Sequence, residues 1–143
     1  MSKVRALVID DSQVMRNIVM QCLGRSGLGE FEFTEAGDGE EGLKKFSPTS
    51  IDIVFVDWNM PVMTGIEFVR RLRANPKGGK VPIVMVTSEK TMGKMEDALD
   101  KAHANAYVCK PFTVEDLQRS VAPLLKEAEA RSAKGGGFFS KLV

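Results

Sequence analysis

Side chains that can bind a metal ion or a phosphate follow four separate apolar runs of the chain. They comprise two adjacent carboxylates, a third carboxylate, a pair of hydroxyls and one amine: Asp10, Asp11, Asp57, Thr87, Ser88 and Lys110. Three carboxylates that lie close together repel one another unless a cation lies between them. Oxygen ligands without a nearby Cys or His suit Mg²⁺, which in proteins commonly meets one or two carboxylates together with a phosphate. The pattern predicts a site for Mg²⁺-dependent chemistry on a phosphoryl group.

Asp57 is the predicted nucleophile of this chemistry. The Lys110 ammonium and the neighbouring hydroxyls would bind the oxygens of a phosphoryl group and neutralise their charge during transfer. A carboxylate nucleophile forms an acyl phosphate. Asp57 is preferred to the other carboxylates because the remaining groups flank it on both sides.

These side chains meet only if the apolar runs are parallel strands of one sheet. The predicted strands, each followed by a helix, span residues 4–9, 31–36, 53–56, 82–86 and 106–109. Alternating strands and helices favour β-α-β units with right-handed crossovers. The predicted fold is therefore α/β, a doubly wound five-stranded parallel sheet with helices on both faces. The carboxyl ends of its strands form one edge, where the polar groups gather.

Three of the helices carry specific expectations. Ser12 is a plausible N-cap for the first helix, and Pro123 should kink or end the last one. The inward-facing residues predicted for the first helix are Met15, Ile18, Val19 and Cys22. Those predicted for a weakly apolar helix from about Lys90 to Lys101 are Met92, Met95 and Leu99. Because it would make few buried contacts, we expect the helix from about Lys90 to Lys101 to be relatively mobile.

Composition narrows the class of protein. The chain has 143 residues and a net charge of +1, with 43% hydrophobic residues, which is ordinary for one globular domain. The balanced charge gives no sign of a nucleic-acid or membrane partner. Cys22 and Cys109 suit reduced thiols better than a disulfide. We expect a cytoplasmic monomer.

Four motifs in this order resemble the receiver domain of two-component response regulators, and within that family the stand-alone chemotaxis type. They are Asp-Asp-Ser-x-x-Met-Arg (10–16), Asp-Trp-Asn-Met-Pro-x-Met-x-Gly (57–65), Met-Val-Thr-x-Glu (85–89) and Tyr-Val-x-Lys-Pro-Phe-Thr (107–113). The resemblance covers about residues 3–126. It implies the strand order 2-1-3-4-5.

The resemblance also implies roles for individual residues. Asp57 would take the phosphoryl group from a histidine kinase. The implied Mg²⁺ ligands are Asp10 through a bound water, Asp11, Asp57 and the backbone carbonyl of Asn59. Thr87, Ser88 and Lys110 would bind the phosphate, and the Lys110–Pro111 peptide bond would be cis.

A switch is implied as well. The Thr87 hydroxyl would move toward the phosphate and the Tyr107 ring would turn inward, which would change the face made by the fourth helix, the fifth strand and the fifth helix. This face would bind a downstream protein, such as a flagellar motor switch component or a phosphatase. Asn59 and Glu89 lie where the family tunes the lifetime of the phosphate.

Other functions fit parts of the pattern. The chain could act as a phosphate sink or relay receiver in another two-component pathway. A haloacid-dehalogenase-type phosphohydrolase also uses a strand-end aspartate and Mg²⁺, but it needs a second acid where this chain has Asn59. A flavodoxin-like flavin protein should have Ser, Thr and Gly after the first strand, where this chain has Asp-Asp-Ser-Gln.

The end of the chain differs from the rest. We divide the sequence into a receiver domain, residues 1–127, and a flexible Gly-rich tail, residues 128–143. The tail ends in an apolar peptide containing Phe138, Phe139 and Leu142. It is either a frayed terminus or a docking peptide on a glycine tether.

Overall fold

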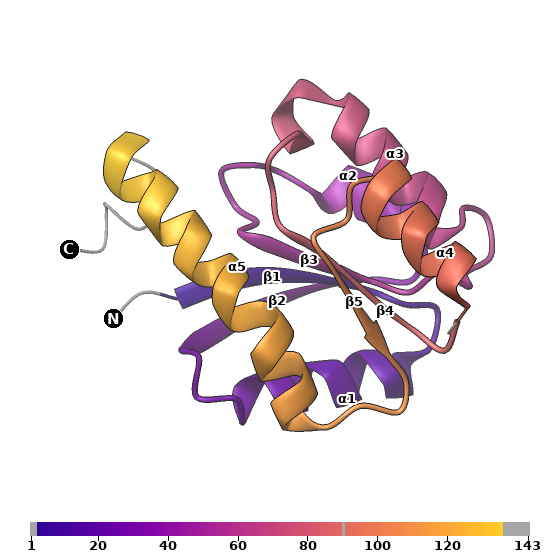
Figure 1. Ribbon diagram of the computed structural model, residues 1–143, viewed down its shortest axis with the longest axis horizontal. Helices are drawn as coiled ribbons and strands as arrows, with labels where there is room; N and C mark the ends of the chain where they lie inside the picture. Colours follow the sequence, from indigo (N-terminus) through magenta and orange to yellow (C-terminus); the bar gives the residue numbers. More distant parts are fainter. Residues whose placement is uncertain (1–2, 90, 136–143) are drawn as a thin grey trace.

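Five strands and five α-helices alternate along residues 3–89 and 91–135, the part of the chain that the computed structural model describes (Figure 1). The strands are β1 (Lys3–Ile9), β2 (Glu30–Ala36), β3 (Ile53–Val56), β4 (Ile83–Thr87) and β5 (Ala106–Cys109). The helices are α1 (Gln13–Gly24), α2 (Gly39–Lys45), α3 (Gly65–Ala74), α4 (Met92–Glu96) and α5 (Val114–Gly135). A 3₁₀ turn η1 (Pro76–Gly78) follows α3, and a π-helical turn η2 (Asp97–Lys101) follows α4.

The strands form one parallel sheet in the order β2-β1-β3-β4-β5, which confirms the predicted fold class and strand order. Ile9 of β1 pairs with Val56 of β3, and Thr87 of β4 pairs with Cys109 of β5. The strands therefore end nearly level with one another. Residues that follow these pairs lie at the same edge of the sheet.

Helices cover both faces of the sheet, with α2, α3 and α4 on one side and α1 and α5 on the other (Figure 1). Phe68 and Leu72 of α3 pack against one face, and Leu23 of α1 with Leu117 of α5 pack against the other. All four residues of β3 are buried, which explains why this run is apolar throughout. Burial on both faces fixes the strand that leads to Asp57.

Side chains at two helix starts are placed as their types predict. The Ser12 hydroxyl accepts a hydrogen bond from the Met15 N–H at 3.2 Å and caps α1. The Thr64 hydroxyl accepts one from the Glu67 N–H at 3.3 Å and caps α3. Each cap satisfies a backbone donor that the first helical turn leaves unpaired.

The predicted inward faces of α1 and α4 are partly wrong. In α1, Val19 and Leu23 are buried, but Ile18 is 40% exposed. In α4, Met92 is 71% exposed, and only Leu99 of the predicted set packs against the core from η2. The core positions of this segment are filled by small residues, Ala98 among them, which let the backbone approach the sheet closely.

Pro123 does not end α5, contrary to the early end that the sequence allows. The helix continues through it to Gly135. Pro123 is exposed, so the backbone group that loses its helical partner is on the solvent side. Leu124 and Leu125 are buried on the other side and hold the helix to the sheet.

The segment beyond residue 127 was predicted to be a flexible tail, and its first part, up to Gly135, is helical in α5. The proposed docking residues Phe138, Phe139 and Leu142 lie outside the described residues. The division into receiver and tail therefore stays a prediction. Among the described residues, no helix combines the length and hydropathy that crossing a membrane requires.

Candidate functional site

Backbone pairing continues past the strand ends and fixes the positions of the polar residues there. The Asp57 N–H donates to the Ile9 carbonyl at 3.1 Å, and the Lys110 N–H donates to the Thr87 carbonyl at 2.9 Å. The first bond ties β3 to β1, and the second ties β5 to β4. The side chains of Asp57 and Lys110 are thus held from rigid parts of the sheet.

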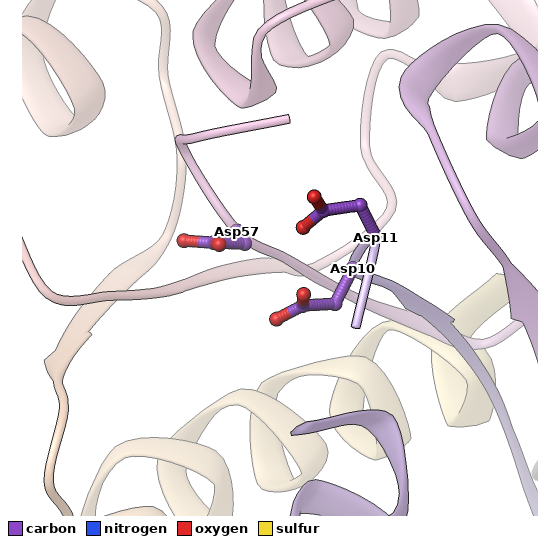
Figure 2. A group of neighbouring side chains, drawn as sticks. All are labelled: Asp10, Asp11 and Asp57. Carbon is purple, nitrogen blue, oxygen red and sulfur yellow. The ribbon is translucent and has the colours of Figure 1, made fainter. Parts of the chain in front are cut away.

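Three carboxylates meet at this edge. One oxygen each from Asp10, Asp11 and Asp57 lies within 4.8 Å of the others. Figure 2 shows the three side chains extending in the same general direction from the ends of β1 and β3. Asp10 and Asp57 are 5% and 8% exposed, whereas Asp11 is exposed. This set of hard oxygen donors, open to water on one side, fits a Mg²⁺ ion that keeps part of its hydration shell.

Lys110 places a positive charge against the carboxylates. Its Nζ lies 3.0 Å from Asp10 Oδ2 and 3.5 Å from Asp57 Oδ2. The Lys110 side chain is 16% exposed, so water screens these contacts only in part. The Lys110–Pro111 peptide bond is cis, as the resemblance predicts. Charge balance at the site therefore comes partly from the chain itself.

Burial raises the pKa of Asp57 above its usual value, and the charge of Asp10 adds to this effect. Lys110, the Thr87 hydroxyl and the Trp58 N–H lower the pKa in opposition, the last by donating to Asp57 Oδ1 at 2.8 Å. A nucleophilic carboxylate must be ionised. The cationic and donor groups around Asp57 favour that ionised form against the effect of burial.

The loop between β3 and α3 returns so closely to Asp57 that it requires glycine at residue 65. A Cβ atom there would lie 2.0 Å from the Asp57 carbonyl oxygen. The same loop holds Val62 at a φ of 72°, in a tight turn that the Met63 N–H closes on the Pro61 carbonyl at 2.7 Å. A β-branched residue is strained in this region. The loop beside the site is therefore both close-packed and locally strained.

Thr87 and Tyr107, the predicted switch pair, are connected through the main chain of Glu89. The Glu89 N–H donates to the buried Thr87 hydroxyl at 3.3 Å, and the Tyr107 hydroxyl donates to the Glu89 carbonyl at 2.7 Å. Movement of Thr87 toward a phosphate would disturb the segment that also holds the ring. Ser88, which lies between Thr87 and Glu89 in the sequence, is exposed.

Glu89 also contacts Asn59, the other residue expected to tune the phosphate lifetime. Asn59 Nδ2 donates to Glu89 Oε1 at 3.1 Å. The same oxygen lies 3.4 Å from Lys94 Nζ, which in turn lies 5.0 Å from the centre of the Trp58 ring. These side chains link α4 to the residue next to Asp57.

Sequence reasoning missed two residues of this arrangement. Lys94 was not singled out, because a lysine in an amphipathic segment normally indicates a solvated face. Arg16 appeared only as part of a motif, yet it donates to the Asp10 carbonyl and forms an ion pair with Glu35 at 2.9 Å. For Arg16, the available signal was the position of a basic residue in the first turn of α1, close to Asp10.

Residues 6–122 match the family model for the response regulator receiver domain. Chemotaxis protein CheY1 of Helicobacter pylori is 36% identical over 123 residues, which cover 85% of this chain and 97% of that protein. The solved structure of chemotaxis protein CheY4 of Vibrio cholerae is 33% identical, with a TM-score of 0.75 over 85% of this chain and 98% of that one. Sequence and structure thus agree on the relatives of this chain.

A further structural neighbour bears on the metal. It is the receiver domain of a Pseudomonas aeruginosa sensor histidine kinase, 27% identical with a TM-score of 0.69. The match covers 82% of this chain and 93% of that domain, which holds a magnesium ion in its active-site cleft.

Proposed function

We propose a function for this chain, which belongs to the family of response regulator receiver domains. In this function, Asp57 accepts a phosphoryl group from a histidine kinase in a Mg²⁺-dependent reaction. The observation that carries the proposal is the position of Asp57, which is buried at the end of β3 beside two other carboxylates, with Lys110 Nζ 3.5 Å from its Oδ2 atom. Buried, cationic and acidic groups rarely converge on one carboxylate unless it has a function.

Asp11 and Asp57 would hold the metal ion directly, with the Asn59 backbone carbonyl as a further ligand and Asp10 acting through a water. The bound ion would neutralise charge on the phosphoryl oxygens and orient the phosphoryl group for attack by Asp57. The exposure of Asp11 beside two buried carboxylates supports entry of a hydrated ion from the solvent side.

The chain's own residues would divide the remaining work. A carboxylate oxygen of Asp57 attacks phosphorus, the bond from phosphorus to the histidine nitrogen of the donor breaks, and an acyl phosphate forms. The phosphoryl oxygens are bound by Lys110, Thr87 and Ser88. The chain acts on itself once per transfer, as a signalling domain rather than as an enzyme with a separate substrate.

Phosphorylation would then alter protein binding. Thr87 gives up its acceptor role toward Glu89 as its hydroxyl donates to the phosphate, and Tyr107 changes position as the Glu89 segment moves. The face of α4, β5 and α5 would change accordingly. A chemotaxis role follows from the relatives, which are named chemotaxis proteins. The partner would be a flagellar motor switch component or a phosphatase, bound by a cytoplasmic monomer.

Two alternative functions differ from this proposal, one in its partner and one in its chemistry. A phosphate sink or relay receiver would share the chemistry of Asp57 but have no partner whose binding depends on the phosphate. A phosphohydrolase needs an acid at residue 59, and Asn59 instead donates its amide to Glu89 at 3.1 Å.

Trp58 fluorescence provides the test, because the ring lies next to Asp57 and is the only tryptophan in the chain. Mg²⁺ should change the emission saturably, and acetyl phosphate should then cause a second change accompanied by the added mass of one phosphoryl group. Asp57→Asn should abolish the added mass. Asp100→Asn, an exposed acid on η2, is the matched control and should behave like the wild type. Unchanged mass in the wild type with Mg²⁺ and donor present would refute the proposal.

A further inference from the structure

A basic stretch of the chain lies away from the phosphorylation site. Residues 68–82 contain five Arg or Lys residues and no Asp or Glu: Arg70, Arg71, Arg73, Lys77 and Lys80. The stretch runs from α3 through η1 to the start of β4, and so reaches the edge of the sheet opposite to Asp57. None of the chemistry assigned to Asp57 uses these residues.

Arg73 is the half-buried member of this stretch, and its hydrogen bonds go only to neutral groups. Its Nε donates to the His103 carbonyl at 2.9 Å, and its Nη1 donates to the Gly78 and Val81 carbonyls at 2.9 and 2.7 Å. Its Nη2 donates to Asn105 Oδ1 at 2.7 Å. Within residues 3–89 and 91–128, whose side chains the structure describes, no carboxylate forms an ion pair with Arg73.

The charge of Arg73 is therefore oriented but not neutralised. Four of the five guanidinium N–H groups have acceptors in these contacts, which leaves one N–H on Nη2. Burial lowers the pKa of Arg73, as expected for a cation without a counter-charge. An anion bound at Nη2 would supply that charge.

An open pocket of about 400 Å³ lies at this point, lined by Arg73, Gly79, Lys80, His103 and Asn105. The Asn105 Oδ1 atom already accepts from Arg73 and from the Ile83 N–H at 2.8 Å, so the amide nitrogen of Asn105 remains as a donor. The polar side-chain groups offered to the pocket are thus donors and cations: an Arg N–H, an amide NH₂, a Lys ammonium and an imidazole.

The pocket is built on fixed backbone. A Cβ atom at Gly78 would lie 2.5 Å from Leu72 Cδ1, so η1 packs directly on α3 and its glycine is required. His103 has a φ of 66°, and the next segment is held by the Asn105 N–H, which donates to the Ile83 carbonyl at 2.7 Å. Donors held in place before binding lose little entropy when a ligand binds.

We propose that this pocket binds the phosphate group of a small molecule, through Arg73, Lys80, His103 and the amide of Asn105. A phosphate group offers three acceptor oxygens and close to two negative charges, which matches donors that converge from several directions. The site is separate from Asp57 and does not depend on the phosphoryl transfer proposed above.

The imidazole of His103, the only histidine of the chain, gives a direct proton NMR probe of this pocket. The full chain is titrated with inorganic phosphate at fixed pH without Mg²⁺, against chloride at equal ionic strength. We expect saturable shifts of the His103 resonances with phosphate and not with chloride. Lys80→Gln should weaken the affinity about threefold or more, the contribution of one surface ion pair.

Two controls separate the proposal from its alternatives. Lys44→Gln removes an exposed lysine of α2 and should leave the affinity unchanged, and Asp57→Asn should leave it unchanged as well. Shifts that are linear in phosphate, equal with chloride, or equally weakened by Lys80→Gln and Lys44→Gln would show general screening and overturn the proposal. Loss of the shifts in Asp57→Asn would place the phosphate at the other edge and overturn it too.

Discussion

Helices α3 and α4 cover the same face of the sheet but are attached to it in different ways. The ten residues of α3 bury Phe68, Val69 and Leu72 together with its first glycine. The five residues of α4 bury none, and the following π-helical turn buries only Ala98. The start of α4 is held instead by polar contacts near Glu89 and Lys94.

This difference separates a fixed half of the site from an adjustable half. Burial of apolar side chains fixes α3 on the sheet. Gly65, at the start of this helix, packs closely against the backbone of Asp57 and so fixes that residue as well. A segment held by few buried contacts and by solvent-accessible polar groups opens locally at lower free energy than the core. The fold therefore fixes Asp57, the proposed phosphoacceptor, more firmly than it fixes α4.

The largest expected effect breaks the anchoring of α3. Phe68→Ala should lower the free energy of unfolding by about 3–5 kcal/mol, because it leaves a cavity in a fully buried position. Met92→Ala, the matched change in α4, should alter it by no more than about 0.5 kcal/mol. Urea denaturation followed by circular dichroism measures both. Similar losses in the two variants would contradict the comparison.

Ionisation of Tyr107 tests the polar attachment of α4. Burial raises the pKa of this tyrosine from its ordinary value of 10.0 to about 12. The folded-state pKa is above the unfolded one, so the stabilisation by the neutral phenol is fully present below pH 10 and is lost as the pH rises from about 10 to about 12. Phenolate absorbance reports this residue alone, since the chain has one tyrosine.

The control for this titration is the same chain in concentrated urea, whose phenol should ionise near its ordinary pKa. The native midpoint should lie clearly higher. Coinciding midpoints would mean that the Tyr107 phenol is not shielded from water in solution.

Relief of strain beside α3 should have a smaller effect. Val62→Asn replaces a β-branched residue at positive φ by one that tolerates this conformation, and should raise stability by about 1 kcal/mol. The side chain is 75% exposed, so little packing is lost. Val14→Asn, at an exposed position of α1, should bring no such gain in the same urea experiment. An equal gain in both would exclude strain as the cause.

The smallest effect concerns Lys94. Lys94→Gln removes the cation over Trp58 and the ion pair with Glu89, and should cost about 0.5 kcal/mol while changing Trp58 emission. Lys101→Gln also breaks an ion pair, with Asp97, but not one near the ring. Its emission should match that of the wild type. An unchanged spectrum in Lys94→Gln would remove this link between α4 and the site.

The sheet and its polar edge could be predicted from sequence for a physical reason. Strands buried on both faces must be apolar throughout, so runs such as 53–56 are easily recognised, and parallel pairing forces the residues after them to one edge. The positions of Asp57 and Lys110 follow from this topology. The cap at Ser12 could be predicted for a different reason, because it depends only on local chemistry.

The attachment of individual helices could not be predicted in the same way. Spacing shows which side chains share a helix face, but not how far that face lies from the sheet. In α4 and η2 the approach is set by small residues such as Ala98, so Met92 is left in solvent. Pro123 misled because the cost of a proline depends on which side of the helix it occupies.

The position of Lys110 bears on whether the protein stays folded when no metal ion is bound. Its ammonium contacts both buried carboxylates, so part of their negative charge is compensated in the folded chain without any metal ion. Small domains whose folding depends on a bound metal ion unfold when a chelator removes it. Under the proposed function, a shortage of Mg²⁺ would stop phosphoryl transfer to Asp57 but leave the chain folded, so that restored Mg²⁺ would find an intact population of the protein.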